Sequence, residues 1–89
     1  MARAVFTQQL RRFTAAPEVD SAAATLRGAL EDAFAATPRL RGYILDDPGH
    51  LRKHVIVFID GVRVRDYEKL NDVLGSASQV HVLQALTGG

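Results

Sequence analysis

Hydrophobic and polar positions change their spacing along the chain, and these changes predict its elements. Residues 3–10 begin with a β-branched apolar run that predicts an opening strand. Residues 11–16 follow as a turn, and residues 17–20 alternate weakly, as a short strand pairing back on the first would. The start of the chain is therefore expected to form a hairpin.

A single amphipathic helix is predicted from residue 21 to residues 36–37, where alanine and leucine dominate. Ser21 or Thr25 is the expected N-cap, and Pro38 ends the helix because it disfavours helical geometry in the residue before it. One face is apolar and expected to pack on a sheet: Leu26, Leu30, Ala33 and Phe34. The opposite face is expected to meet water: Arg27, Glu31 and Asp32.

The second half of the chain predicts an ordered crossover and three strands. Residues 38–53 form a connector with a turn at residues 46–49, anchored by four apolar side chains: Leu40, Tyr43, Ile44 and Leu45. Residues 54–59 are apolar at consecutive positions, which suits a strand covered on both faces. Asp60-Gly61 predicts a type I′ turn into a strand over residues 62–65.

Residues 67–74 are expected to form a short helical turn or loop whose apolar side chains point inward: Leu70, Val73 and Leu74. A final strand is predicted over residues 79–85, with Val80 and Val82 on its buried face. The order is hairpin, helix, crossover, hairpin, strand. This order predicts an α+β domain over residues 1–85, with a mixed four- to five-stranded sheet packed on one main helix, and a flexible tail over residues 86–89.

Composition restricts the class of protein. The chain has 89 residues, of which 47% are hydrophobic and 24% charged, as expected of one globular domain. It has no cysteine, so it has no disulfide and no thiol nucleophile, which favours a cytoplasmic location. The net charge of +1 and scattered basic residues predict no nucleic-acid partner, and no apolar run is long enough for a membrane span or a signal peptide.

Enzymatic and metal-binding motifs are not apparent in the sequence. His50 and His54 are four residues apart, but this stretch follows a Pro-Gly turn and enters a strand, so no metal site is expected. No nucleophile and base share a recognisable spacing, and no glycine-rich phosphate loop occurs. The protein is therefore expected not to be an enzyme.

Five segments carry a resemblance to a known family. They are the opening strand at residues 5–10, the Ala-Ala-Thr-Leu-Arg entry to the helix, the Arg-Gly-Tyr-Ile-Leu-Asp-Asp segment at 41–47, the Val-Phe-Ile-Asp-Gly strand and turn, and the terminus Gln84-Ala85-Leu86-Thr87-Gly88-Gly89. Together the segments resemble the MoaD/ThiS family of ubiquitin-like β-grasp sulfur carriers. Gln84 and Asp60 replace a proline and an asparagine that are common in the family.

The resemblance implies a carrier whose working group is the C-terminal carboxylate of Gly89. Such carriers bind no cofactor. An E1-like adenylating enzyme uses ATP to activate the terminal glycine, a sulfurtransferase or other sulfur donor converts it to a thiocarboxylate, and a sulfur-accepting enzyme in a biosynthetic pathway of the molybdopterin or thiamine type receives the sulfur. The resemblance assigns this chemistry only to Gly88 and Gly89.

The terminus suits that chemistry. An α-carboxylate with a pKa near 3.5 is anionic at neutral pH and a poor electrophile, so it must be activated before sulfur can attack it. Glycine at 88 and 89 lets the backbone enter a narrow cleft, and Leu86, Thr87, Gly88 and Gly89 together would reach roughly 13 Å when extended. A Gly-Gly ending occurs by chance in about 0.5% of chains, which argues against coincidence.

A docking surface is also expected, because the tail alone would bind weakly. Strand alternation places Val57, Ile59, Val80 and Val82 toward the helix. The opposite sheet face then presents an apolar set with a basic rim, which is the docking hypothesis: Ile56, Phe58, Leu83 and Ala85, with Arg63 and Arg65 at the rim.

Two other functions fit the same residues. A ubiquitin-like modifier would also be adenylated at Gly89 but would join target lysines through an isopeptide bond. A plain interaction module would carry an idle tail. For Phe58 and Leu83, ordinary burial in a strand covered on both faces is as compatible with the sequence as docking.

Overall fold

One mixed sheet and two helices make up the part of the chain that the computed structural model describes, residues 1–6 and 18–84. The five strands lie in the order β2-β1-β5-β3-β4. Their bounds are β1 Ala2–Phe6, β2 Glu18–Ser21, β3 Val55–Ile59, β4 Val62–Arg63 and β5 Gln79–Gln84. β1 and β5 are parallel, whereas the other neighbouring pairs are antiparallel. The α+β class, the mixed sheet and the antiparallel pairing of the first two strands are confirmed; the predicted continuation of the first strand over residues 7–10 and the predicted turn over residues 11–16 lie outside the described residues.

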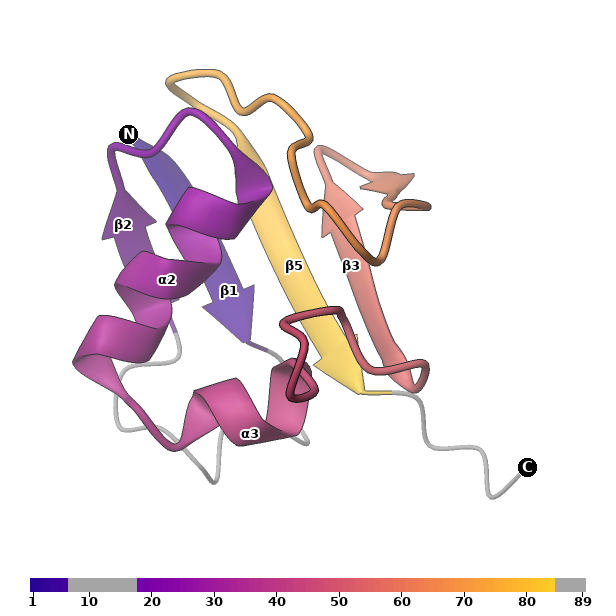
Figure 1. The fold of residues 1–89 in the computed structure, drawn as a ribbon. Coiled ribbons are helices and arrows are strands. Elements are labelled where there is room, and N and C mark those ends of the chain that lie inside the picture. The colour runs from indigo at the N-terminus through magenta and orange to yellow at the C-terminus, as the bar shows by residue number, and fades with distance from the viewer. Residues whose placement is uncertain (7–17, 85–89) are drawn as a thin grey trace.

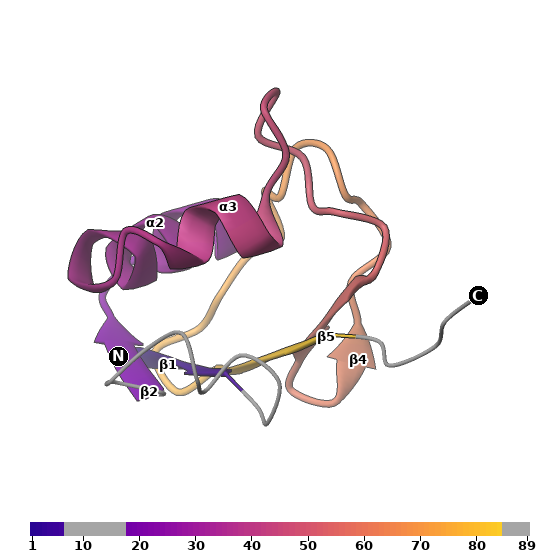
Figure 2. The same cartoon turned by 90° about the horizontal axis from the view of Figure 1, so that it is seen from below.

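Both helices lie on the same face of the sheet (Figure 2). α2, Leu26–Ala36, crosses β1 and β2, and the short α3, Leu40–Ile44, follows it (Figure 1). The apolar stripe of α2 is buried in one cluster with the inward side chains of β1, β5 and β3. The expected core face of the sheet is confirmed, because Val57, Val80 and Val82 are buried and Ile59 packs partly buried against them.

α2 begins at Leu26, later than the sequence predicts. Ser21 belongs to β2, where it pairs with Ala2, and its hydroxyl donates to Asp32 and accepts from the Ala23 amide. Thr25 is the N-cap: its hydroxyl accepts from the Gly28 amide. The prediction of Ser21 as the N-cap is therefore wrong, because its backbone pairs in β2 and its hydroxyl is bonded to Asp32 and to the Ala23 amide.

Gly28 and Gly42 are both helical, and their surroundings predict opposite effects of alanine. A Cβ at Gly28 would lie 2.7 Å from the Cβ of Ala23, whereas a Cβ at Gly42 would meet nothing within 4 Å. We expect Gly42→Ala to raise the free energy of unfolding by about 0.5–1 kcal/mol, the usual gain in helix propensity. Gly28→Ala should lower it by about 1–3 kcal/mol, because the clash outweighs that gain. Urea unfolding of both variants checks this, and an equal gain in both would contradict it.

The crossover contains a helix that the sequence did not predict. Leu40, Ile44 and Leu45 are buried as expected, but Tyr43 is 42% exposed, so its predicted role as an anchor is wrong. Leu40 and Ile44 of α3 both point into the core, whereas Tyr43 lies about 100° around the helix axis from Ile44 and so turns toward solvent. The turn at residues 46–49 is confirmed: the Gly49 amide donates to the Asp46 carbonyl, and Gly49 has a φ of 89°.

The second hairpin has the predicted turn but a shorter second strand. Asp60 and Gly61 both have positive φ, 51° and 84°, as a type I′ turn requires. β4 ends at Arg63, and Val62 is 70% exposed. Val64 still donates its amide to the Val57 carbonyl and is buried. The alternation was therefore correct for Val64 and wrong for Val62, which lies beside the turn at the edge of the sheet.

Residues 67–74 form no helix. Leu70 and Leu74 are buried as predicted, but Val73 is 82% exposed. A β-bridge between Val73 and Thr25 explains the difference, because it joins this segment to the start of α2 in extended form. In an extended segment Val73 and Leu74 point to opposite sides, so only Leu74 reaches the core.

Arg27 was predicted to meet water but instead holds two loops. It is partly buried, and its guanidinium donates to the backbone carbonyls of Gly49, Glu68 and Lys69 at 3.0, 2.8 and 3.2 Å. Sequence periodicity assigns a side chain to a helix face, but it does not show which loop passes over that face. One guanidinium thus fastens the start of α2 to both the 46–49 turn and the 67–74 segment.

Candidate functional site

β5 positions the end of the chain, because it is the central strand of the sheet. It lies between β1 and β3, and its last described residue, Gln84, pairs with Val55 at the beginning of β3 (Figure 1). The strand is therefore paired on both sides as far as Val82, and on the β3 side as far as Gln84. The predicted site residues Leu86, Thr87, Gly88 and Gly89, and Ala85 of the docking hypothesis, lie outside the described residues.

The apolar members of the predicted docking surface share the sheet face opposite the helices. Ile56 pairs with Leu83, and Phe58 pairs with His81, across the β3–β5 ladder. Ile56, Phe58 and Leu83 are each partly buried, whereas Val55 and Val57 between them are buried on the other face. The predicted grouping of these three side chains is confirmed; β3 is not fully buried on both faces.

A continuous row of paired residues crosses this face through all five strands. Its members, from β2 to β4, are Glu18, Val5, His81, Phe58 and Arg63. Val5 and His81 were not among the predicted docking residues. Alternation along β5 already places His81 on the face of Leu83, whereas Val5 joins this face through the parallel pairing of β1 with β5, which the pattern of a single strand does not show.

The basic rim of this surface is formed by side chains from the β4 edge. Arg63 ends the row described above, and Arg65 follows it two residues later; both are exposed. Arg63 and Arg65 line an open pocket together with Val64, Tyr67 and Lys53. Lys53 was missed because it precedes β3 in sequence, and only the fold brings it to the same edge.

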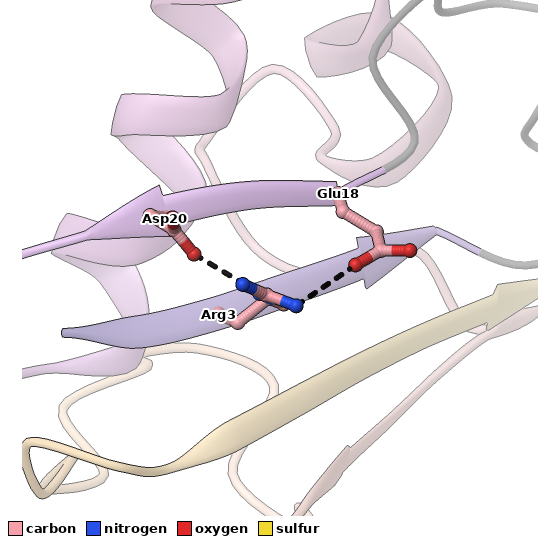
Figure 3. Close-up of polar contacts among 3 residues, drawn as sticks. All are labelled: Arg3, Glu18 and Asp20. Atoms are coloured by element: carbon pink, nitrogen blue, oxygen red, sulfur yellow. Dashed lines mark hydrogen bonds and ion pairs between the residues drawn. The ribbon is translucent and has the colours of Figure 1, made fainter.

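At the opposite edge of the sheet, basic and acidic side chains neutralise one another. Arg3 on β1 lies between Asp20 and Glu18 of β2, and its guanidinium donates to both carboxylates at 3.0 and 3.2 Å (Figure 3). Asp20 and then Glu18 raise the pKa of Arg3. All three side chains are about half exposed, so solvent screens both ion pairs and their contribution to stability is small.

Within residues 1–6 and 18–84 the polar side chains form no recognisable catalytic or metal centre. No three histidine, aspartate or glutamate side chains there gather as metal ligands, and His50 and His54 precede β3 without forming such a group. Over the same ranges no helix is long and apolar enough to cross a membrane.

Comparison with solved structures identifies the fold. SAMP1 from Haloferax volcanii has a TM-score of 0.81 and 21% identity, over 99% of this chain and 98% of that one. A chain of the Amycolatopsis orientalis BexX/CysO complex has a TM-score of 0.84 and 18% identity over the whole of both chains. The chain has the ubiquitin-like β-grasp fold. Mycobacterium tuberculosis CysO matches this β-grasp fold as well, with a TM-score of 0.82 and 21% identity over 97% and 100% of the two chains.

These neighbours share the β-grasp fold along their full length, although the sequences have diverged widely. No protein-family model matches the sequence, and the search of curated proteins found no match either. The likeness is therefore one of backbone arrangement. It supports the fold that the sequence resemblance implies. The function has to be argued from the residues of this chain.

Proposed function

We propose that this protein is a ubiquitin-like sulfur carrier that works through the carboxylate of Gly89. An ATP-dependent activating enzyme joins this carboxylate to AMP and releases pyrophosphate. A sulfur nucleophile then displaces AMP, which leaves a thiocarboxylate that passes its sulfur to an acceptor. The protein is on this view a co-substrate and contributes no catalytic side chain of its own.

The observation that carries this proposal is the combination of the β-grasp fold with a Gly-Gly ending directly after the central strand. β5 pairs with β1 as far as Val82 and with β3 as far as Gln84, and five residues follow Gln84 up to the terminal carboxylate. An activating enzyme could hold the rigid sheet and receive a short extended tail, whose glycines allow close backbone approach.

The sheet face with Ile56, Phe58 and Leu83 is the proposed docking surface for that enzyme. Their partial burial leaves apolar area for a partner to cover, and Arg63 and Arg65 lie beside it. The neighbour solved as part of the BexX/CysO complex supports docking between a protein of this fold and a second protein.

A second function, protein modification through an isopeptide bond from Gly89 to lysine, is favoured by one observation. Two neighbours are named small archaeal modifier protein 1, from Haloferax volcanii and Methanosarcina acetivorans. Carrier and modifier share the adenylated glycine and differ only in the nucleophile that attacks it.

Intact-mass spectrometry of the protein produced with its activating enzyme and a sulfur source tests the proposal. Exchange of one terminal oxygen for sulfur is the expected result for a carrier. Target lysines that carry the C-terminal tryptic peptide of this chain, residues 70–89, would support the modifier instead. An unmodified terminus in the presence of ATP and an active enzyme would contradict both functions.

A further inference from the structure

The pocket at the β4 edge combines three basic side chains that have no acidic partner in the part of the chain described. Lys53, Arg63 and Arg65 line it with Val64 and Tyr67, and all three basic residues are exposed. We call this the basic groove. None of its lining residues is acidic, so its positive charge is not compensated from within.

Most other basic side chains in the described ranges are already engaged. Arg3 binds Asp20 and Glu18 (Figure 3), and Arg41 binds Glu31. Arg27 and Arg52 donate to backbone carbonyls. Arg39 and Lys69 lie alone, so within the described ranges the basic groove is the place where several unpaired cations gather.

The acidic residue closest in sequence to the groove is turned to other donors. Asp66 accepts hydrogen bonds from the amides of Glu68 and Lys69 at 2.9 and 3.1 Å, and these amides lower its pKa. Asp66 thus binds the turn that follows Tyr67, and in the described part of the chain it forms no ion pair with Arg65.

Hydrogen bonds to β3 hold the residues at the base of the groove in place, whereas its basic side chains are exposed to solvent. The Tyr67 hydroxyl donates to the Val55 carbonyl at 2.6 Å, and the Val64 amide donates to the Val57 carbonyl at 2.8 Å. These bonds fix the 64–67 segment along β3. Arg63 and Arg65, two residues apart in an extended segment, then point to the same side.

We propose that the basic groove binds a cluster of carboxylate side chains on a partner protein. This inference rests on the proposed function in taking the partner to be a protein that docks on the adjoining sheet face. Arginine suits such contacts because its guanidinium can hold a carboxylate with two hydrogen bonds. The neighbouring apolar surface favours a protein partner over a bare polyanion, which would leave Ile56, Phe58 and Leu83 uncovered.

Titration of the isotopically labelled full chain with an oligoglutamate peptide, followed by NMR, tests this without ATP or an activating enzyme. We expect the amide shifts to concentrate on residues 53 and 63–67, and the affinity to fall with added salt. The triple variant Lys53→Ala, Arg63→Ala, Arg65→Ala should bind at least about fivefold more weakly. The single variant Arg63→Ala should also bind more weakly, whereas Arg39→Ala, which removes one exposed arginine outside the groove and so matches it in charge, should bind unchanged.

Several results would overturn the inference. Equal weakening by Arg39→Ala and the triple variant would reduce the effect to net charge. Amide shifts concentrated elsewhere on the surface would show that the peptide does not bind in the groove. Tighter binding of an oligonucleotide than of the peptide would show that the groove does not prefer carboxylates of a protein. Because the assay contains no adenylation step, such a failure would leave activation at Gly89 intact, and a failure of activation would leave the peptide result intact.

Discussion

Deletion of Gly89 is expected to abolish activation of the protein by its adenylating enzyme. The shortened chain still ends in a glycine carboxylate, that of Gly88, but the carboxylate lies one residue, about 3.3 Å, short of the nucleotide. A reacting group displaced by as little as 1 Å costs about a hundredfold in rate. ATP–pyrophosphate exchange should therefore fall by at least about a hundredfold.

The same variant provides its own control for folding and docking. The described core ends at Gln84, so its thermal unfolding should match that of the full chain. If the sheet face docks independently of the tail, the variant should inhibit activation of the full chain competitively. Normal exchange with the deletion variant would show that Gly89 is not the activated residue.

Arg27→Met should produce the largest loss of stability among substitutions of charged residues in this chain. It removes three hydrogen bonds from a charged donor to the carbonyls of Gly49, Glu68 and Lys69, while the methylene stem is largely preserved. Bonds to charged groups contribute about 1.5–3 kcal/mol each when buried, and these are partly exposed. We expect a total loss of about 2–3 kcal/mol, which corresponds to roughly 10–20 °C in Tm.

Urea unfolding measures this loss of stability, and two further variants serve as comparisons. Arg27→Lys retains the charge without the planar fork and should recover only part of the stability. Arg39→Met replaces an exposed arginine and should change the free energy of unfolding by no more than about 0.5 kcal/mol. A similar small effect at Arg27 would mean that the two loops hold their positions without the guanidinium.

Local pattern predicted the elements of this fold better than their ends and their contacts. The hairpin turn at Asp60 and Gly61, the stripe of α2 and the buried face of β5 follow from short-range rules of spacing and turn chemistry. The start of α2, the exposure of Val73 and the role of Arg27 depend on segments distant in sequence. Such contacts outweigh helix propensity and periodicity, which are weak preferences.

The residues of the candidate site were likewise predicted only where local pattern determines their position. Alternation correctly grouped Ile56, Phe58 and Leu83, because residues two apart in a strand share a face. His81 follows from the same alternation because it lies two residues before Leu83 on β5, whereas Val5 and Lys53 join the surface only through strand order and the crossover. The role of Gly89 rests on chemistry and resemblance, and it stays a prediction.

The parallel pairing of β1 with β5 also has a mechanical consequence. The described chain begins at one end of this central pair and leaves it at the other, with Arg3 beside Gln79 and Phe6 beside Val82. Tension applied between the two ends would load the hydrogen bonds of the pair together, in shear, instead of opening them one after another. A motor protein that unfolded this chain by pulling on its C-terminal end would therefore meet the largest mechanical resistance at the start of unfolding.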